Sequence, residues 1–109
     1  MLKLTLFIEN DNLLELNGLM SSTTSTYQNS GMGVVATLYT LTGSEVAGQS
    51  WPVAMSYVSS SDGDYRCTLS NSLQVSRETD YKATITAVAS STGVKGTFHR
   101  WVRAKDRTT

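Results

Sequence analysis

Apolar and polar residues alternate strictly along residues 80–89. The apolar side of this segment consists of Tyr81, Ala83, Ile85 and Ala87. Alternation at a period of two residues is typical of a strand with one face in a core and the other face in water. The segment therefore predicts a half-buried β-strand.

Shorter runs of the same kind, each bounded by turn residues, fill most of the remaining chain. They predict further strands at residues 2–8, 13–16, 32–41, 45–47, 51–58, 65–69 and 94–103. No amphipathic helix of useful length is present, and the turn signals are spaced as in two-sheet sandwiches. The pattern predicts an all-β fold of seven or eight strands in two stacked sheets.

Turn residues predict how some of these strands connect. Short amide and carboxylate side chains at residues 10–12 indicate a turn, because they bond to their own backbone there. Asn12 and Gly18 favour a hairpin over a helical turn at residues 13–16. Gly43 can adopt a positive φ in the predicted hairpin turn at residues 42–45.

Residues 20–31 form a run of polar side chains without periodicity. Such a run cannot bury enough apolar surface to offset the entropy lost on ordering. We expect a long polar loop here within a single sandwich domain, residues 1–104, followed by a flexible tail, residues 105–109. Tyr27 is the residue in the loop that could anchor to the sandwich or to a partner, and a plain linker between two strands is the alternative.

The formal charges of the chain cancel, with nine basic and nine acidic residues. This balance argues against nucleic acid or an anionic membrane as the principal partner. The two parts of the chain differ, because residues 1–62 carry one basic and five acidic residues (net −4) and residues 63–109 carry eight basic and four acidic residues (net +4). Head-to-tail docking between copies is one interpretation, and an ordinary solvated distribution of charge is the other.

No segment of the chain indicates a membrane or a secretory route. No stretch approaches the roughly 18 apolar residues of a membrane span. Residues 1–10 are too short and too interrupted for a signal-peptide core. We expect synthesis and folding in a cytoplasm.

Catalytic and metal-binding chemistry has little support in the sequence. Cys67 is the only cysteine and alternates with apolar neighbours, which predicts a core residue rather than a nucleophile. His99 is the only histidine and lacks the partners that a catalytic or zinc site needs. Asp62-Gly63-Asp64 is followed by Arg66 instead of further calcium ligands, and so predicts a turn. Gly31-Met32-Gly33 lacks the helix and lysine of a phosphate loop. We expect no enzyme activity, no metal and no cofactor.

Basic residues gather at the C-terminal end of the chain around Trp101. They are Lys95, Arg100, Arg103, Lys105 and Arg107. Nucleic acid is one possible ligand, but no recognised binding signature surrounds the group. A docking surface for an acidic neighbouring protein is favoured, because Trp and Arg dominate protein interfaces.

Two sets of candidate residues follow from these patterns. The predicted partner-binding residues are Tyr27, Tyr39, Trp101, Arg100 and Arg103. The predicted core residues are Trp51, Tyr65, Cys67, Tyr81 and Ile85.

The spacing Val75-x-x-x-Thr79-x-Tyr81, followed by the alternating run to Ala87, resembles the sixth strand of fibronectin type III and related immunoglobulin-like domains. In those domains the tyrosine packs at a sheet corner and its hydroxyl bonds to nearby backbone. The resemblance implies an immunoglobulin-like antiparallel β-sandwich of about seven or eight strands. Trp51 departs from the pattern, because it lies later in the chain than the usual core tryptophan of those domains.

A broader likeness extends over residues 31–103. Its motifs are Val35-x-Thr37-Leu38-Tyr39, Gly43-x-Glu45-Val46-Ala47-Gly48, Trp51-Pro52, Tyr57-Val58 and Asp62-Gly63-x-Tyr65-Arg66. Their succession resembles small proteins encoded in the structural regions of tailed phages and prophages. The resemblance implies a sandwich mounted on a virion after synthesis in the bacterial host cytoplasm, without indicating where on the virion it sits.

The resulting expectation is a non-enzymatic structural protein of a tailed phage. It would be an accessory subunit bound to capsid, portal or neck and tail subunits, at the capsid or the head-to-tail neck or collar. Multiple copies on a symmetric assembly would add avidity. The alternative is a tail-fibre or baseplate module that binds host-surface carbohydrate or protein through exposed aromatic side chains.

Overall fold

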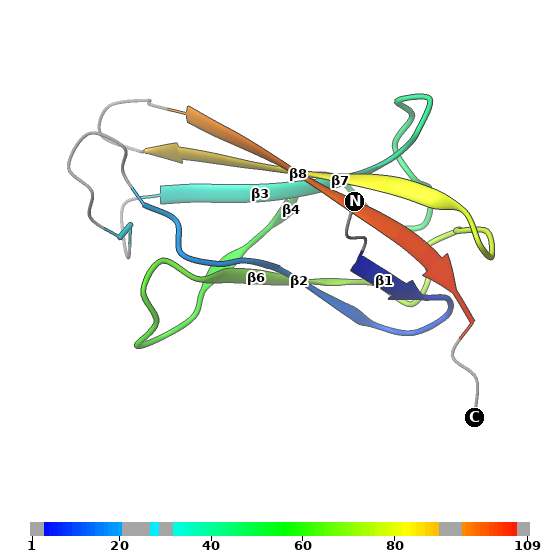
Figure 1. The fold of residues 1–109 in the computed structure, drawn as a ribbon, viewed down its shortest axis with the longest axis horizontal. Coiled ribbons are helices and arrows are strands. Elements are labelled where there is room, and N and C mark those ends of the chain that lie inside the picture. The colour runs from blue at the N-terminus through cyan, green and yellow to red at the C-terminus, as the bar shows by residue number, and fades with distance from the viewer. Residues whose placement is uncertain (1–3, 21–26, 29–31, 90–94, 107–109) are drawn as a thin grey trace.

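The computed structural model describes residues 4–20, 27–28, 32–89 and 95–106. The strands are Leu4–Phe7 (β1), Asn12–Leu16 (β2), Met32–Thr40 (β3), Val53–Ala54 (β4), Ser56–Tyr57 (β5), Tyr65–Leu69 (β6), Asp80–Ala89 (β7) and Lys95–Lys105 (β8). They form a five-stranded sheet in the order β1-β8-β7-β3-β4 and a three-stranded sheet in the order β2-β6-β5 (Figure 1). The predicted all-β architecture of two sheets is confirmed.

None of the described residues belongs to a helix that is long and apolar enough to cross a membrane.

Strand β7 lies at the centre of the five-stranded sheet. It pairs antiparallel with β3 on one side and with β8 on the other. β1 pairs parallel with the C-terminal part of β8, from Leu4 opposite Val102 to Phe7 opposite Lys105. The strand predicted from strict alternation at residues 80–89 has the same bounds as β7.

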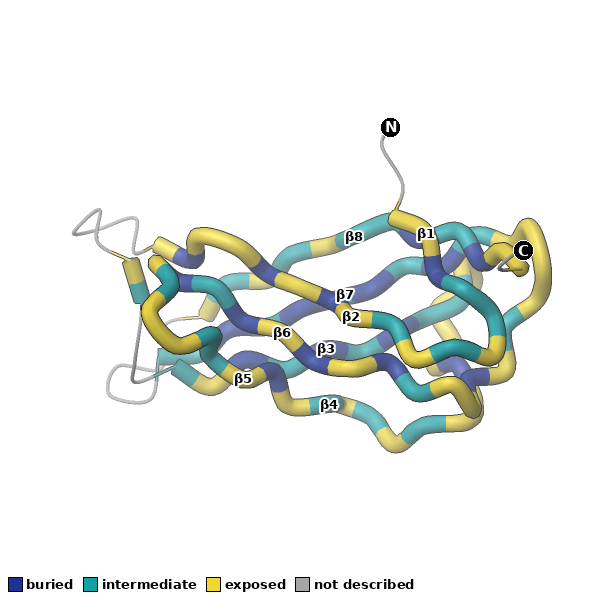
Figure 2. Tube along the Cα trace, turned by 90° about the horizontal axis from the view of Figure 1, so that it is seen from below, coloured by how far each residue is buried: buried dark blue, intermediate teal, exposed yellow. Residues whose placement is uncertain are grey.

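The core lies between the two layers, where each strand contributes alternate residues (Figure 2). Leu38 and Ile85 are the largest side chains below 2% exposure. Of the predicted core residues, Tyr65, Cys67, Tyr81 and Ile85 are all buried. Trp51 is only partly buried at the margin of the core, where its Nε1 donates a 2.7 Å hydrogen bond to the carbonyl of Val46.

The predicted hairpin at residues 13–16 is wrong. β1 pairs with β8 in one sheet and β2 pairs with β6 in the other, so the turn at residues 8–11 carries the chain between layers. The side chain of Asn12 closes this turn. Its Oδ1 accepts from the Phe7 N–H and its Nδ2 donates to the Phe7 carbonyl, both at 2.9 Å. An amide side chain thus satisfies backbone groups that a hairpin ladder would have paired.

The single strand predicted at residues 51–58 is also wrong, because the chain changes sheets within it. β4 pairs with β3 and β5 pairs with β6. Met55, between them, is 6% exposed, and its N–H donates to the Val34 carbonyl at 2.8 Å. Every second residue faces the core both before and after the chain changes sheets. The alternation of the sequence is therefore the same as in a single strand.

The predicted strand at residues 45–47 is reduced to one bridge, between Tyr39 and Glu45. The turn before it agrees with the prediction, since Gly43 has a φ of 98°. The Gly43 N–H donates to the Thr40 carbonyl at 3.0 Å.

The last strand extends beyond its predicted end at residue 103. Ala104 is 0% exposed, and the carbonyl of Lys105 accepts a 2.9 Å hydrogen bond from the Ile8 N–H. Lys105 therefore belongs to β8 and not to the tail predicted at residues 105–109, of which residues 107–109 lie outside the described residues. The parallel partner β1 comes from the other end of the chain, so no local pattern indicates this extension.

Most of the predicted loop at residues 20–31 lies outside the described residues. The flanking residues are bonded to the three-stranded sheet and its turns. Leu19 donates from its N–H to the Gly63 carbonyl and accepts from the Gln28 N–H, both at 2.8 Å. The Tyr65 hydroxyl donates to the Gln28 carbonyl at 2.8 Å.

Candidate docking face

Side chains that point away from the core on β3, β7 and β8 form the outer face of the five-stranded sheet. Strand register places Tyr39 opposite Lys82 and Lys82 opposite Trp101. These three residues, the Tyr39–Trp101 row, cross three neighbouring strands. Strands lie about 4.8 Å apart, so the two aromatic residues sit roughly 10 Å apart with the lysine between them.

The orientation of Trp101 follows from its neighbours on β8. Val102 and Ala104 are 3% and 0% exposed, so they face the core and Trp101 faces outward. Trp101 and Tyr39 are both partly exposed. An aromatic ring in this position can contact a partner while its strand stays paired in the sheet.

Small and polar side chains continue the outer face beyond this row. The next row is Thr37, Thr84 and His99, and the row after it is Val35, Thr86 and Thr97. The Thr84 hydroxyl and the His99 Nδ1 share a hydrogen bond of 3.2 Å. His99 is exposed, as expected for a strand histidine. Because the side chains of the other two rows are small or polar, the Tyr39–Trp101 row carries the largest apolar side chains of the three rows.

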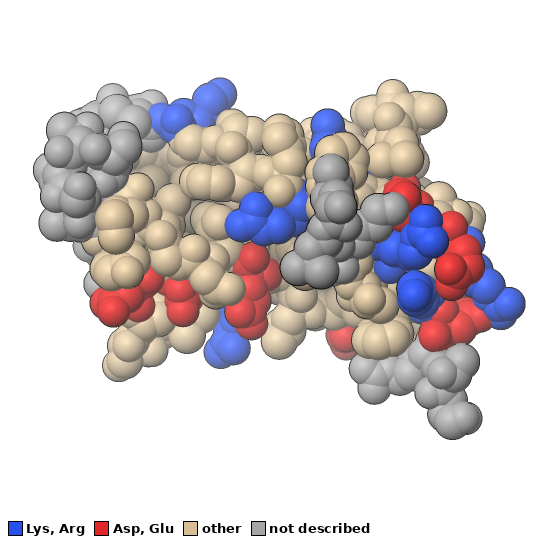
Figure 3. Space-filling model, in the orientation of Figure 1, with Lys and Arg blue, Asp and Glu red and all other residues tan. Residues whose placement is uncertain are grey.

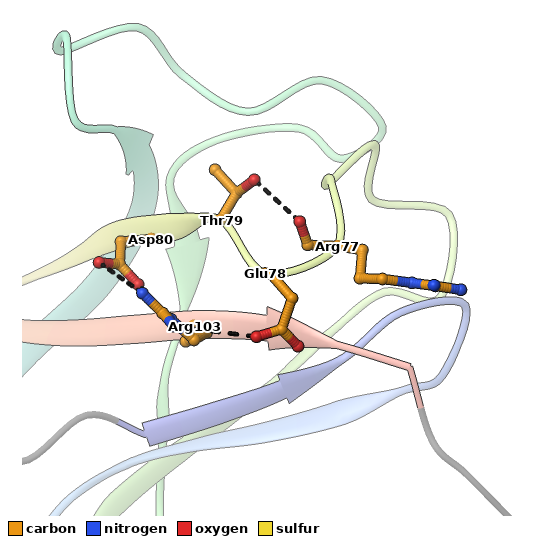
Figure 4. A network of polar contacts seen from close by, with 5 residues as sticks. All are labelled: Arg77, Glu78, Thr79, Asp80 and Arg103. Carbon is orange, nitrogen blue, oxygen red and sulfur yellow. Dashed lines mark hydrogen bonds and ion pairs between the residues drawn. The ribbon is translucent and has the colours of Figure 1, made fainter.

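On the other side of the row, Arg103 is bound to acidic residues of its own chain. Its Nε donates to Asp80 Oδ1 at 2.8 Å, and its Nη1 lies 3.8 Å from Glu78 Oε2 (Figure 4). The hydrogen bond that Arg103 donates to Asp80 raises the pKa of Arg103 above its ordinary value. Arg103 shares the outer face with Trp101, but its guanidinium is held by β7 and the turn before it.

Opposite charges are mixed at the end of the molecule where β8 finishes, on the right in Figure 3. Arg77 pairs with Asp106 there, next to the Arg103 group. Both sheets also combine strands from the acidic and the basic parts of the chain, and Glu15 on β2 stands opposite Arg66 on β6. The acidic and basic parts of the chain are therefore mixed in the fold, although they are separate in the sequence.

Two predicted partner-binding residues do not lie on the outer face. Arg100 stands opposite Ala83, which is 0% exposed, so its position is on the core-facing side of β8. Its Nη1 donates to the carbonyl of His99 at 3.0 Å. Tyr27 is 45% exposed and forms a bridge with Met20, away from the Tyr39–Trp101 row. Tyr39, Trp101 and Arg103 are thus the predicted residues that the fold brings to one face.

Asp64, one of the two acidic residues at residues 62–64, has a structural role. The Asp64 Oδ1 accepts a 2.8 Å hydrogen bond from the Gly18 N–H, which joins the turn before β6 to the end of β2. Among residues 4–20, 27–28, 32–89 and 95–106, no group of three or more His, Cys, Asp or Glu side chains could hold a metal ion.

Burial accounts for the state of the single thiol. Cys67 is 8% exposed, and desolvation raises the pKa of its thiol from 9.0 to about 11. A thiol with this pKa is protonated at neutral pH and is a poor nucleophile.

Lys82 is the residue of the docking face that sequence reasoning did not single out. The alternation of residues 80–89 assigns it to the polar side, but its place between two aromatic residues depends on long-range register. The outer face of the other sheet exposes Leu13, which is 62% exposed on β2. Leu13 therefore provides a comparison position on the opposite side of the sandwich.

Comparison with family models, curated proteins and solved structures found no match to this chain.

Proposed function

We propose that the chain is an immunoglobulin-like domain. The strand order supports this assignment, since the three-stranded sheet joins the second, sixth and fifth strands, and the other sheet joins the eighth, seventh, third and fourth. Immunoglobulin sandwiches have the corresponding B-E-D order in one sheet and G-F-C order in the other, and the variable type adds a C′ strand to the G-F-C sheet, as β4 does beside β3. The hydroxyl of Tyr81 near the start of β7 accepts a 2.8 Å hydrogen bond from the Ser76 N–H, as in a tyrosine corner.

The proposed function is adhesion without catalysis, as an accessory structural subunit of a tailed-phage virion at the capsid or the head-to-tail neck. The Tyr39–Trp101 row carries the proposal. Two partly exposed aromatic side chains flank a lysine on a sheet whose other face packs against the core. The virion setting rests on the sequence motifs between residues 31 and 103.

The composition of the row suits a protein partner. Tyr and Trp supply large contact areas and are the residue types most often found at the energetic centre of interfaces. Lys82 would face a carboxylate on the partner, and the surrounding threonines would form the polar rim. An interface of about 800 Å² on each side is sufficient for specific binding, and several copies on a symmetric shell would add avidity.

Binding assays with the purified capsid, portal and neck proteins of the same genome test this proposal. Trp101→Ala removes the larger anchor, and we expect at least about a tenfold loss of affinity, as for an interface hot spot. The free energy of unfolding of the isolated variant should fall by a smaller amount, because Trp101 is partly exposed. Leu13→Ala, on the other sheet, is the matched control and should bind as the wild type does.

Three results would contradict the proposal. Equal affinity of the Trp101→Ala and wild-type proteins would exclude the row as the contact. Loss of affinity in Leu13→Ala alone would assign the contact to the three-stranded sheet. Tight binding of the isolated protein to host-surface glycans, with no binding to virion subunits, would favour the fibre or baseplate module instead.

A further inference from the structure

Among the described residues, the first half of β8 is an open sheet edge. β8 runs from Lys95 to Lys105, but its pairing with β1 begins only at Val102. No other strand of the described residues pairs with this side of β8. Residues 95–101 therefore present one row of backbone groups away from β7.

Hydrogen bonds at the end of β8 identify which backbone groups point outward. The Ala104 N–H donates to the Thr79 carbonyl and the Ala104 carbonyl accepts from the Glu78 N–H, so residue 104 faces the β7 side. The Lys105 carbonyl accepts from Ile8 on the opposite side. Backbone groups alternate between the two edges of a strand, and β8 keeps continuous register with β7 from residue 95 to 103. The outward groups of the open edge thus belong to residues 95, 97 and 99 and to the N–H of Trp101, because the Trp101 carbonyl borders the first pair of the β1–β8 ladder and accepts from β1.

Arg100 covers one of these outward groups. Its side chain starts on the core-facing side of β8, opposite Ala83, and its Nη1 donates to the outward carbonyl of His99 at 3.0 Å. A charged residue that points inward on an edge strand is a known means of preventing edge-to-edge pairing, because pairing would bury the charge or displace it. The guanidinium therefore protects the middle of the open edge.

The open edge is complementary to itself when two copies meet antiparallel about Phe98. In this register Lys95 stands opposite Trp101 of the second copy and Arg100 stands opposite Gly96, so no two cations face each other. The outward residues meet as 95 with 101 and 97 with 99, and with the Trp101 carbonyls held by β1 they form a total of about six hydrogen bonds. Lys95 over the Trp101 ring adds a cation–π contact. A shift of two residues in either direction shortens the paired segment.

We propose that the β8 edge at residues 95–101 is a self-association surface for a second copy of this chain, which Arg100 keeps closed in the free protein. Association requires the guanidinium to leave the His99 carbonyl, which then accepts from Thr97 of the second copy. The dimer joins two five-stranded sheets into one continuous sheet and brings two Tyr39–Trp101 rows onto one surface. This inference does not depend on the proposed virion function.

Sedimentation velocity of the purified full-length chain over a concentration series tests the proposal. Arg100→Thr removes the guanidinium and places a strand-forming residue at the edge. We expect it to dimerise at a concentration at least tenfold below that of the wild type. Arg66→Thr removes an exposed arginine from β6 with the same change in net charge, and should behave as the wild type does.

A second substitution localises the contact to the edge. Proline at position 97 removes one outward N–H and no hydrogen bond to β7, and proline is tolerated on edge strands. Arg100→Thr with Thr97→Pro should be monomeric over the whole series, whereas Arg100→Thr with Thr97→Ala should dimerise. Amide exchange followed by NMR gives an independent measurement in Arg100→Thr itself. The Thr97 and His99 amides should exchange at least tenfold more slowly in the dimer, and the Phe98 amide should be unchanged.

The proposal is overturned if Arg100→Thr associates no more readily than the wild type or Arg66→Thr. It is also overturned if the Thr97 and His99 amides are not slowed in a dimer that does form. A wild-type protein that dimerises as tightly as the variant would show that Arg100 does not close the edge.

Discussion

At the residue scale, side chains satisfy backbone groups at places where the strands leave them unpaired. Asn12 closes the turn between the two layers through the N–H and carbonyl of Phe7. Gln49 bonds to the edge of β6, donating to the Thr68 carbonyl at 3.3 Å and accepting from the Ser70 N–H at 3.0 Å. Fixing such a side chain costs less free energy than leaving a partly buried backbone group without a hydrogen-bond partner.

Tyr81 gives the sharpest stability prediction of this kind. Tyr81→Phe keeps the ring in the core but leaves the Ser76 N–H without its acceptor. We expect the free energy of unfolding to fall by about 1 kcal/mol in urea denaturation. Tyr39→Phe on the outer face is the matched control and should change it by less than about 0.5 kcal/mol. Equal midpoints for Tyr81→Phe and the wild type would contradict the corner assignment.

The buried thiol predicts a pH dependence of stability. The pKa of Cys67 is raised to about 11 in the folded chain, above its ordinary value of 9.0. Between these pH values the unfolded chain loses the thiol proton and the folded chain keeps it, so this group makes the protein less stable as pH rises. The loss is at most about 1.4 kcal/mol per pH unit and is negligible below about pH 8, where the unfolded chain also keeps the thiol proton.

Comparison with Cys67→Ala isolates this contribution, because the tyrosines and lysines titrate in both proteins. The difference in unfolding free energy between wild type and variant should shift against the wild type between pH 8 and pH 10.5. A difference that stays constant over this range would show that the folded thiol titrates as in the unfolded chain.

At the element scale, local pattern predicted strands better than it predicted their partners. Residues 65–69 and 80–89 were predicted within their observed bounds, because one face of β6 and of β7 is buried and the alternation is uninterrupted. The sheet to which a strand belongs is set by its pairing with distant segments, and the local sequence pattern does not indicate that pairing. The sheet switch at Met55 and the parallel pairing of β1 with β8 were therefore missed.

The same limit applied to the candidate site. The sequence indicated that Tyr39 and Trp101 lie on exposed sides of their strands. Only the register with β7 places them in one row with Lys82 between them. Arg100 was grouped with Trp101 because the two are adjacent in sequence, but adjacent residues of a strand point to opposite faces.

Two glycines in turns test how the elements are connected. Gly63 has a φ of 73°, and a Cβ there would lie 2.5 Å from the carbonyl oxygen of Leu19. Gly43 has a φ of 98°, and a Cβ there would meet nothing within 4 Å. Both alanine variants carry backbone strain of about 1–2 kcal/mol. Gly63→Ala must also displace Leu19, so its unfolding free energy should be lower than that of Gly43→Ala by at least about 1 kcal/mol.

Chemical denaturation of the two variants provides the measurement. Equal stability of Gly63→Ala and Gly43→Ala would contradict the close approach between the turn before β6 and the segment after β2.

At the scale of the whole molecule, different surfaces of the sandwich carry different kinds of side chain. The inner faces of both sheets form the core, the ends carry turns and mixed charges, and the outer face of the five-stranded sheet carries the aromatic row. Since Arg103 is held by Asp80 and Glu78, the three side chains of the Tyr39–Trp101 row are the ones on this face that we expect to supply the contact with a partner.

The most direct test of this account is an electron cryo-microscopy reconstruction of the virion to which we propose that this chain belongs, at a resolution that places side chains. We predict that the chain is found at the capsid or the neck, with Tyr39 and Trp101 buried against a neighbouring subunit and Leu13 facing solvent. A particle without this chain, a position at a fibre tip, or a contact through the three-stranded sheet with Trp101 exposed would contradict it.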